Sequence, residues 1–194
     1  MQVNLKQIRG PWDDGYVLDK HSVKSEYAGD NEWGHAQFKT ERTEAGEAVF
    51  LLKNRTDFDQ VQPLAAAVAV HIYPRFADVG FIVPMPASTV RRRQPVIAVA
   101  QALGHMVGKP VLGEFLRKTR AGPSMKDMKS KAEKLAAIGD SFALGGEIPG
   151  GRWNVLLVDD LFHTGASMEK ACTVLRACPS VRGIYVAALT WRSA

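Results

Sequence analysis

The chain has 194 residues, a formal net charge of +5 and an apolar fraction of 46%. These values fit one globular domain, or one domain with a small appendage, that is long enough to bury a core. No apolar run approaches the roughly 18 residues of a membrane-spanning helix, and residues 1–9 are too polar for a signal peptide, so we expect a cytoplasmic protein. The two cysteines, Cys172 and Cys178, fit a reducing compartment, and the lack of a C-x-x-C pair argues against a zinc site.

Charge is unevenly distributed along the chain. Residues 13–47 carry nine acidic and four basic side chains, a difference of −5. Residues 88–134 carry three acidic and eleven basic side chains, a difference of +8. A basic middle segment suits a polyphosphate or a nucleic acid. For charge alone, however, a solvated basic surface is the more common explanation.

Residues 1–42 show no helical period and are predicted to form a small β-rich segment next to a main domain at 43–194. Strands are expected at 16–18 and 36–38, separated by a loop at 27–34 that contains glycine and aspartate. The aromatic residues of this segment could stack on a planar ligand, although such residues more often anchor a small sheet to the core.

After residue 42, patterns typical of buried strands alternate with patterns typical of helices. The expected helices span residues 44–53, 58–76, 95–107 and 168–177, and the expected strands span 81–83, 111–116, 141–144, 155–158 and 184–189. Residues 117–134 are the most polar stretch and are expected to form a mobile loop. This alternation predicts an α/β fold with a central, mainly parallel sheet flanked by helices and with ligands at the carboxyl ends of the strands.

The most informative stretch is residues 154–167, N-V-L-L-V-D-D-L-F-H-T-G-A-S. An apolar strand is followed by Asp159 and Asp160, and Ser167 is expected to cap the next helix. The turn and the start of the helix offer unpaired backbone N–H groups and the positive end of a helix dipole, which suit a phosphate. The two carboxylates suit sugar hydroxyls or a divalent metal. An ordinary buried strand followed by a capped helix is the alternative.

This stretch resembles the phosphoribosyl-pyrophosphate (PRPP) motif of the type I phosphoribosyltransferases, which has an apolar strand, two acids and a Thr-Gly turn. The resemblance implies that Asp159 and Asp160 are catalytic, hold the ribose hydroxyls and contribute to a Mg²⁺ site. It also implies a binding turn for the 5′-phosphate. That turn would be formed by His163, Thr164, Gly165, Ala166 and Ser167. His163 stands where many relatives carry threonine.

Over residues 46–189 the chain is similar to the ComF family, the late-competence branch of these proteins. The similarity rests on Leu52-Lys53, V-P-M-P at 83–86, the arginines at 91–93 before Gln94, Leu116-Arg117, and Ser141-Phe142. It implies a pyrophosphate loop formed by Met85, Pro86, Ala87 and Ser88. It further implies a flexible basic loop that closes over the ligand and carries Arg117, Lys118, Arg120 and Lys126.

Two functions follow from the resemblance. One is a PRPP-binding protein for DNA uptake that works with single-stranded DNA and competence proteins. The other is an active phosphoribosyltransferase that transfers ribose 5-phosphate from PRPP to a nucleobase in salvage. Either could act as a homodimer. Residues 1–42 lack the cysteine-rich zinc segment of many ComF proteins and are the candidate for a hood over the acceptor.

Two other classes of protein are disfavoured. An ATPase would need a phosphate-binding loop, but residues 104–110, G-H-M-V-G-K-P, are one residue short and lack the hydroxyl. A phosphoacceptor domain also has paired aspartates, but they belong near the start of the chain. His105 and His163 do not have the spacing of a transition-metal site.

Overall fold

The computed structural model describes residues 1–87, 89, 91–119, 142–146, 148 and 150–193. Its strands are β1 (Lys6–Gln7), β2 (Asp14–Lys20), β3 (Lys24–Asp30), β4 (Ala36–Glu41), β5 (Val79–Pro84), β6 (Leu116–Lys118), β7 (Phe142–Leu144), β8 (Trp153–Phe162) and β9 (Val181–Trp191). Its helices are α1 (Glu44–Asn54), α2 (Val61–Ala67), α3 (Pro95–Val107) and α5 (Ala166–Arg176). Short helical turns at Phe58–Gln60, Val68–Ile72 and Tyr73–Arg75 flank α2.

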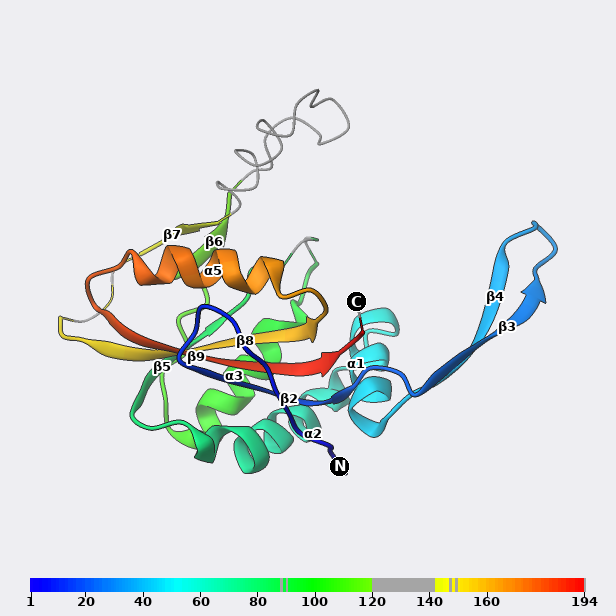
Figure 1. The fold of residues 1–194 in the computed structure, drawn as a ribbon, viewed down its shortest axis with the longest axis horizontal. Helices are drawn as coiled ribbons and strands as arrows, with labels where there is room; N and C mark the ends of the chain where they lie inside the picture. Colours follow the sequence, from blue (N-terminus) through cyan, green and yellow to red (C-terminus); the bar gives the residue numbers. More distant parts are fainter. Residues whose placement is uncertain (88, 90, 120–141, 147, 149, 194) are drawn as a thin grey trace, which may run out of the picture.

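The main sheet has five strands in the order β1-β2-β9-β8-β5. Strands β2, β9, β8 and β5 are parallel, and β1 is antiparallel at one edge. In Figure 1, α5 covers one face of the sheet, and α1, α2 and α3 lie on the other. The predicted fold, a mainly parallel sheet flanked by helices with a small β-rich element near the N-terminus, is therefore confirmed.

The centre of β8 shows why this sequence forms a strand buried on both faces. Val155 and Leu157 pack in the core beneath α5, whereas Leu156 and Val158 pack in the core formed with α1, α2 and α3. All four side chains are fully buried. Successive side chains of a strand point to opposite faces, so an unbroken apolar run serves both helix layers.

The first 42 residues divide between the main sheet and a projecting hairpin. Strand β2 pairs in parallel with β9 and is part of the main sheet. Strands β3 and β4 form a separate antiparallel pair, which Figure 1 shows extending away from the body. The expected loop at 27–34 is wrong for its first four residues, because β3 continues to Asp30. The division of the chain at residue 42 remains a prediction.

Two further expectations concern the segment after α3. The predicted strand at 111–116 is wrong: Val111 makes only an isolated bridge to Ile82, and the chain then turns before β6 begins at Leu116. Most of the predicted loop at 117–134 lies outside the described residues. Among the helices that the structure describes, none is both long and apolar enough to cross a membrane.

Candidate functional site

The acidic pair lies inside the carboxyl end of β8. The sequence predicts that the strand ends before these residues, but pairing with β9 continues as far as Phe162. Because side chains alternate along a strand, Asp159 belongs to the α5 face of the sheet and Asp160 to the face that α1 covers. The two adjacent carboxylates therefore have different neighbours.

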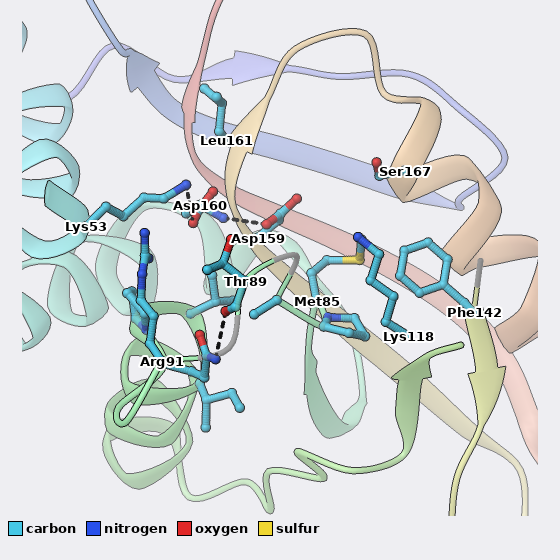
Figure 2. Close-up of a pocket in the computed structure, with 16 residues that line it drawn as sticks. Lys53, Met85, Thr89, Arg91, Lys118, Phe142, Asp159, Asp160, Leu161 and Ser167 are labelled. Atoms are coloured by element: carbon cyan, nitrogen blue, oxygen red, sulfur yellow. Dashed lines mark hydrogen bonds and ion pairs between the residues drawn. The ribbon is translucent and has the colours of Figure 1, made fainter. Parts of the chain in front are cut away.

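Asp160 is paired with a lysine from α1. Lys53 Nζ lies 2.9 Å from Asp160 Oδ2, and the side chain of Asp160 is only 15% exposed. Figure 2 shows Lys53 extending from α1 to this carboxylate. A partly shielded ion pair of this kind is stronger than a solvent-exposed pair. Lys53 thus compensates one of the two negative charges.

Asp159 has an unusually high affinity for a proton. Burial, followed by the neighbouring charge of Asp160, raises the pKa of Asp159 from 3.8 to about 7. The backbone N–H of Asp160, which donates to Asp159 Oδ1 at 2.8 Å, and the charge of Lys53 act in the opposite direction. Without a ligand, Asp159 is therefore partly protonated near neutral pH.

Two buried polar side chains, from the residue after β2 and from β9, support the backbone of the acidic pair. The Thr190 hydroxyl donates to the carbonyl of Asp160 at 2.9 Å, and His21 Nδ1 lies 3.2 Å from the same hydroxyl. Burial, then the charge of Arg192, lowers the pKa of His21 to about 4. His21 is therefore neutral at pH 7, and its Nδ1 carries the proton, because the Thr190 hydroxyl hydrogen is already donated to Asp160.

A close approach of α1 to β2 positions Lys53. A Cβ atom at Gly46 would overlap the backbone carbonyl of His21, so only glycine lets the helix come this near. Thr43 is the N-cap of this helix, and its hydroxyl accepts a hydrogen bond from the N–H of Gly46 at 3.0 Å. Lys53 lies in the last turn of the same helix, beside the acidic pair.

The acidic pair borders a cleft of about 280 Å³ at the carboxyl edge of the sheet (Figure 2). The residues predicted for the site that line this cleft are Met85, Pro86, Ala87, Lys118, Asp159, Asp160 and Ser167. Ser88 lies outside the described residues. The loop after β5 and the end of β8 thus contribute to one cavity, which is the arrangement expected of parallel strands.

A smaller hollow of about 100 Å³ lies at the start of α5. All five residues predicted for the phosphate turn, 163–167, line it, together with Asp159, Leu161, Phe162 and Met168. Asp159, Leu161 and Ser167 border both the hollow and the larger cleft, so the two cavities adjoin. The predicted turn and the predicted acidic pair therefore lie next to each other.

The expected helix cap at Ser167 is wrong. Gly165 caps α5 with a positive φ of 79°, and α5 begins at Ala166. Glycine is suited to this backbone conformation, and a Cβ there would also press on the Phe162 ring at 3.1 Å. The helix start thus lies two residues earlier than predicted, and Ser167 is in its first turn. The backbone N–H groups of the first turn of α5 therefore still lie beside the hollow.

Of the four basic residues expected to close over the ligand, the structure describes Arg117 and Lys118, and their side chains differ in position. Lys118, in β6, lines the cleft. Arg117 does not, because its side chain turns to Glu114, with Nε 3.3 Å from Glu114 Oε2. Arg120 and Lys126 lie outside the described residues.

Sequence reasoning gave no site role to several residues that line the cleft. They are Lys53, Thr89, Arg91, Gln94 and Phe142, among others. A lysine in the last turn of a helix is ordinary, so no local signal distinguishes Lys53. The arginines after the V-P-M-P turn were noticeable as a basic cluster, but only the fold shows that Arg91 faces the acidic pair (Figure 2).

Among the described residues, no group of three or more carboxylate, histidine or cysteine side chains could hold a metal ion. Among the described residues that line the cleft, Asp159 and Asp160 are the acidic side chains that could bind a metal ion. Asp160 is already paired with Lys53. This set suits Mg²⁺ only if phosphate and water oxygens complete its coordination, which is the usual way that proteins bind this ion.

No family model matches the sequence, and no curated protein matches it significantly. Solved structures do match. Adenine phosphoribosyltransferase from Trypanosoma brucei, in complex with AMP, pyrophosphate and ribose-5-phosphate, aligns over 97% of this chain and 74% of its own, with 11% identity and a TM-score of 0.51. Glutamine PRPP amidotransferase from B. subtilis, complexed with ADP and GMP, aligns over 82% of this chain and 34% of its own, with 17% identity and a TM-score of 0.51.

These similarities identify the fold. It is the type I phosphoribosyltransferase fold, with its mainly parallel sheet and its flanking helices. The match spans about a third of the amidotransferase, so it concerns one part of that enzyme. Fold alone does not assign a reaction, which has to be argued from the residues of the site.

Proposed function

We propose that the cleft binds PRPP together with Mg²⁺. The observation that carries this proposal is the position of Asp159, which borders both the cleft and the hollow at the start of α5. A ligand whose ribose hydroxyls donate to Asp159 and Asp160 can extend one phosphate to the turn at 163–167 and a second phosphate group into the cleft. PRPP carries phosphate groups at both ends of its ribose.

The two cavities differ in the way they would bind phosphate. At the turn, backbone N–H groups at the start of α5 and the helix dipole favour a phosphate monoester. In the cleft, the cations Lys53, Arg91 and Lys118 surround the acidic pair and favour the more highly charged pyrophosphate group. The loop at 85–88 would supply further backbone contacts to pyrophosphate.

The residues present fit Mg²⁺ as a partner of the pyrophosphate rather than as a metal held by the protein alone. When bound, Mg²⁺ would neutralise phosphate charge and so make the pyrophosphate a better leaving group. Asp159 and Asp160 are the residues that would hold it, directly or through water. Binding of a cation and ribose hydroxyls beside Asp159 would also favour its ionised form.

The acidic pair can also contribute to chemistry at the ribose. Loss of pyrophosphate from C1 leaves positive charge on the ring, and two fixed carboxylates on that side of the ligand would stabilise it electrostatically. Lys53 pairs with Asp160 at 2.9 Å and so helps to hold this carboxylate in place. The site is therefore suited to transfer of the ribose 5-phosphate group, provided that an acceptor can enter.

For the biological role, we propose a ComF-type protein linked to DNA uptake. Support comes from exposed arginines beside the cleft, which could contact a phosphate backbone. Arg91 and Arg92 are exposed. Arg93 is exposed as well, but it also lies over the Phe58 ring, 4.1 Å from its centroid, and so has a structural contact. Arg92 is therefore the cleanest position at which to test DNA binding.

An active salvage phosphoribosyltransferase is the second candidate, and the apolar part of the cleft favours it. Val96, Ile97 and Phe142 line the cleft alongside the charged residues. Such a surface can accept the face of a nucleobase. In this case the nucleobase nitrogen would attack C1 of the ribose as the bond to pyrophosphate breaks.

One experiment separates these functions. PRPP and Mg²⁺ would be titrated calorimetrically, and pyrophosphate release would then be followed with each nucleobase in turn. Binding with release in the presence of one base identifies an enzyme, whereas binding without release identifies a binding protein. Absence of PRPP binding would overturn the proposed function. Salt-sensitive binding of single-stranded DNA that Arg92→Ala weakens would support the competence role.

A further inference from the structure

Residues 23–41, which contain β3 and β4, form an arm that is exposed on both faces. The exposed fractions are 74% for Trp33 and 60% for each of Val23, Tyr27 and Phe38. Figure 1 shows the arm projecting away from the body, with no other labelled element beside it. The arm therefore presents large apolar side chains that nothing in the described chain covers.

One face of the arm carries mainly apolar and hydroxyl side chains. Tyr27 lies opposite Phe38, and their rings meet edge to face with centroids 5.9 Å apart. Ser25 lies opposite Thr40, and their hydroxyl oxygens are 3.0 Å apart. Val23 lies two residues before Ser25 and continues the same face towards the body. One charged group reaches this set: the Tyr27 hydroxyl donates to Asp30 Oδ1 at 2.8 Å, and Asp30 is itself exposed to solvent.

The other face is charged. Lys24 lies opposite Glu41, and Glu26 lies opposite Lys39. Lys24 Nζ is also 2.6 Å from Glu26 Oε1. These four side chains carry both signs and are exposed to solvent. The hairpin thus has the alternation of a sheet built to cover a core on one face, although no core lies beneath it.

A two-stranded hairpin of this kind is marginally stable in water by itself, and a second layer is needed to stabilise it. An uncovered apolar patch on a protein surface commonly marks an interaction site. The exposed apolar face of the hairpin is therefore expected to be covered by a partner in the functional protein.

We infer that the apolar face of the arm packs against the same face of a second copy of this chain. Like faces can meet without burying a charge, because Val23, Ser25, Tyr27, Phe38 and Thr40 are uncharged. The carboxylate of Asp30, at the end of β3, is exposed and can remain in solvent. A nucleic acid would need cations, yet residues 23–41 contain four acidic residues and two lysines. The same acidic balance disfavours an anionic lipid surface.

The available area agrees with a specific but weak dimer. Fully buried aromatic side chains cover about 150–250 Å² each, so the partly exposed Tyr27, Trp33 and Phe38 of two copies, with Val23 and the hydroxyl pair, offer roughly 1,000 Å² in total. That value is close to the lower limit for a specific interface. A two-fold axis across antiparallel arms would bring Trp33 at each tip towards Val23 at the base of the other arm.

The test is sedimentation equilibrium of the full chain from low micromolar to submillimolar concentration. The wild type is expected to dimerise reversibly. The variant Tyr27→Ser/Phe38→Ser should dissociate at least tenfold more readily, and Trp33→Ala, which lies in the turn and leaves the strand pairs intact, should also weaken the dimer. The matched control Glu26→Gln/Lys39→Gln, on the charged face, should dimerise like the wild type.

A wild type that stays monomeric throughout this range would overturn the inference, as would apolar-face variants that dimerise as tightly as the wild type. A dimer weakened equally by the charged-face control would also contradict it, because the interface would then not be the apolar face. Trp33 fluorescence gives an independent measure, since burial of the indole should shift its emission to shorter wavelength as the concentration rises.

Discussion

The cleft and the arm begin at the same edge of the sheet, but they are built in different ways. The cleft combines α1, the loop after β5, α3, β6, β7, β8 and α5, which lie far apart in the sequence. The arm consists of one hairpin whose contacts are mainly between its own strands. The charge properties of the cleft therefore depend on the whole fold, whereas the arm needs a partner outside the body to gain stability.

The largest difference is expected when apolar side chains of the two regions are truncated. Leu156 is fully buried in β8, and Leu156→Ala should lower the free energy of unfolding by about 2–5 kcal/mol. Tyr27→Ala in the arm should lower it by about 1 kcal/mol, because the lost interactions are one exposed cross-strand pair and one exposed hydrogen bond to Asp30. Urea unfolding followed by circular dichroism measures both. Equal losses of unfolding free energy in the two variants would contradict the view that the sheet is packed into the core while the arm is not.

A second difference concerns the response to pH. Asp159 releases its proton near pH 3.8 in the unfolded chain but near about 7 in the folded protein, so the folded state holds more protons between these values. Asp159 therefore contributes to the free energy of unfolding at low pH, and this contribution is lost as the pH rises through about 7. The loss should amount to roughly a few kcal/mol.

The variant Asp159→Asn isolates this contribution. The difference in unfolding free energy between variant and wild type should grow in favour of the variant as the pH rises from about 4 to about 7, and then stay constant. His21 acts oppositely, because its pKa is lowered to about 4, but this effect is common to both proteins and cancels. A difference that does not change with pH would show that Asp159 titrates normally.

A third, smaller difference is expected between removal of a lysine from the cleft and removal of a lysine from the arm. Lys53→Met keeps the length of the side chain but removes the cation that pairs with Asp160 at 2.9 Å. PRPP affinity should fall about tenfold, which corresponds to about 1.4 kcal/mol, because the cleft loses positive charge and Asp160 loses its partner. Calorimetric titration measures it. Lys39→Met in the arm is the matched control and should bind like the wild type; an equal loss in both would point to a general charge effect.

The smallest effect is expected when side chains of the arm are replaced and the affinity for PRPP is measured. The variant Tyr27→Ser/Phe38→Ser should bind PRPP with nearly unchanged affinity, since neither side chain lines the cleft. Titration under conditions where both proteins are monomeric makes the comparison direct. A large loss of affinity would mean that the arm contributes to the ligand site, as a hood would.

The contrast also explains what the sequence could predict. An apolar run followed by two aspartates predicts a buried strand, and β8 is that strand, although it extends three residues beyond Asp159. The phosphate turn at 163–167 could be located because its signals are local: glycine, threonine and a helical pattern. The true cap, Gly165, was missed because Ser167 is by type the more usual capping residue.

Other parts depend on contacts between distant segments and left no local signal. Lys53 meets Asp160 only because Gly46 lets α1 approach β2. Strand β2 belongs to the main sheet through its pairing with β9, at the other end of the chain. Strand β3 was missed because lysine, glutamate, glycine and aspartate interrupt its pattern. The roles of the site residues in PRPP binding remain predictions.

The most direct test of the central claim is calorimetric titration of PRPP and Mg²⁺ into the wild type, Asp159→Asn and Asp160→Asn. We expect both variants to fold and each to lose about 1.5–3 kcal/mol of binding free energy for every charge-assisted hydrogen bond removed. Asp159→Asn should also be at least as stable as the wild type at pH 7, because its buried carboxyl is gone. Equal affinity of all three proteins for PRPP would contradict the proposal that this acidic pair holds the ribose.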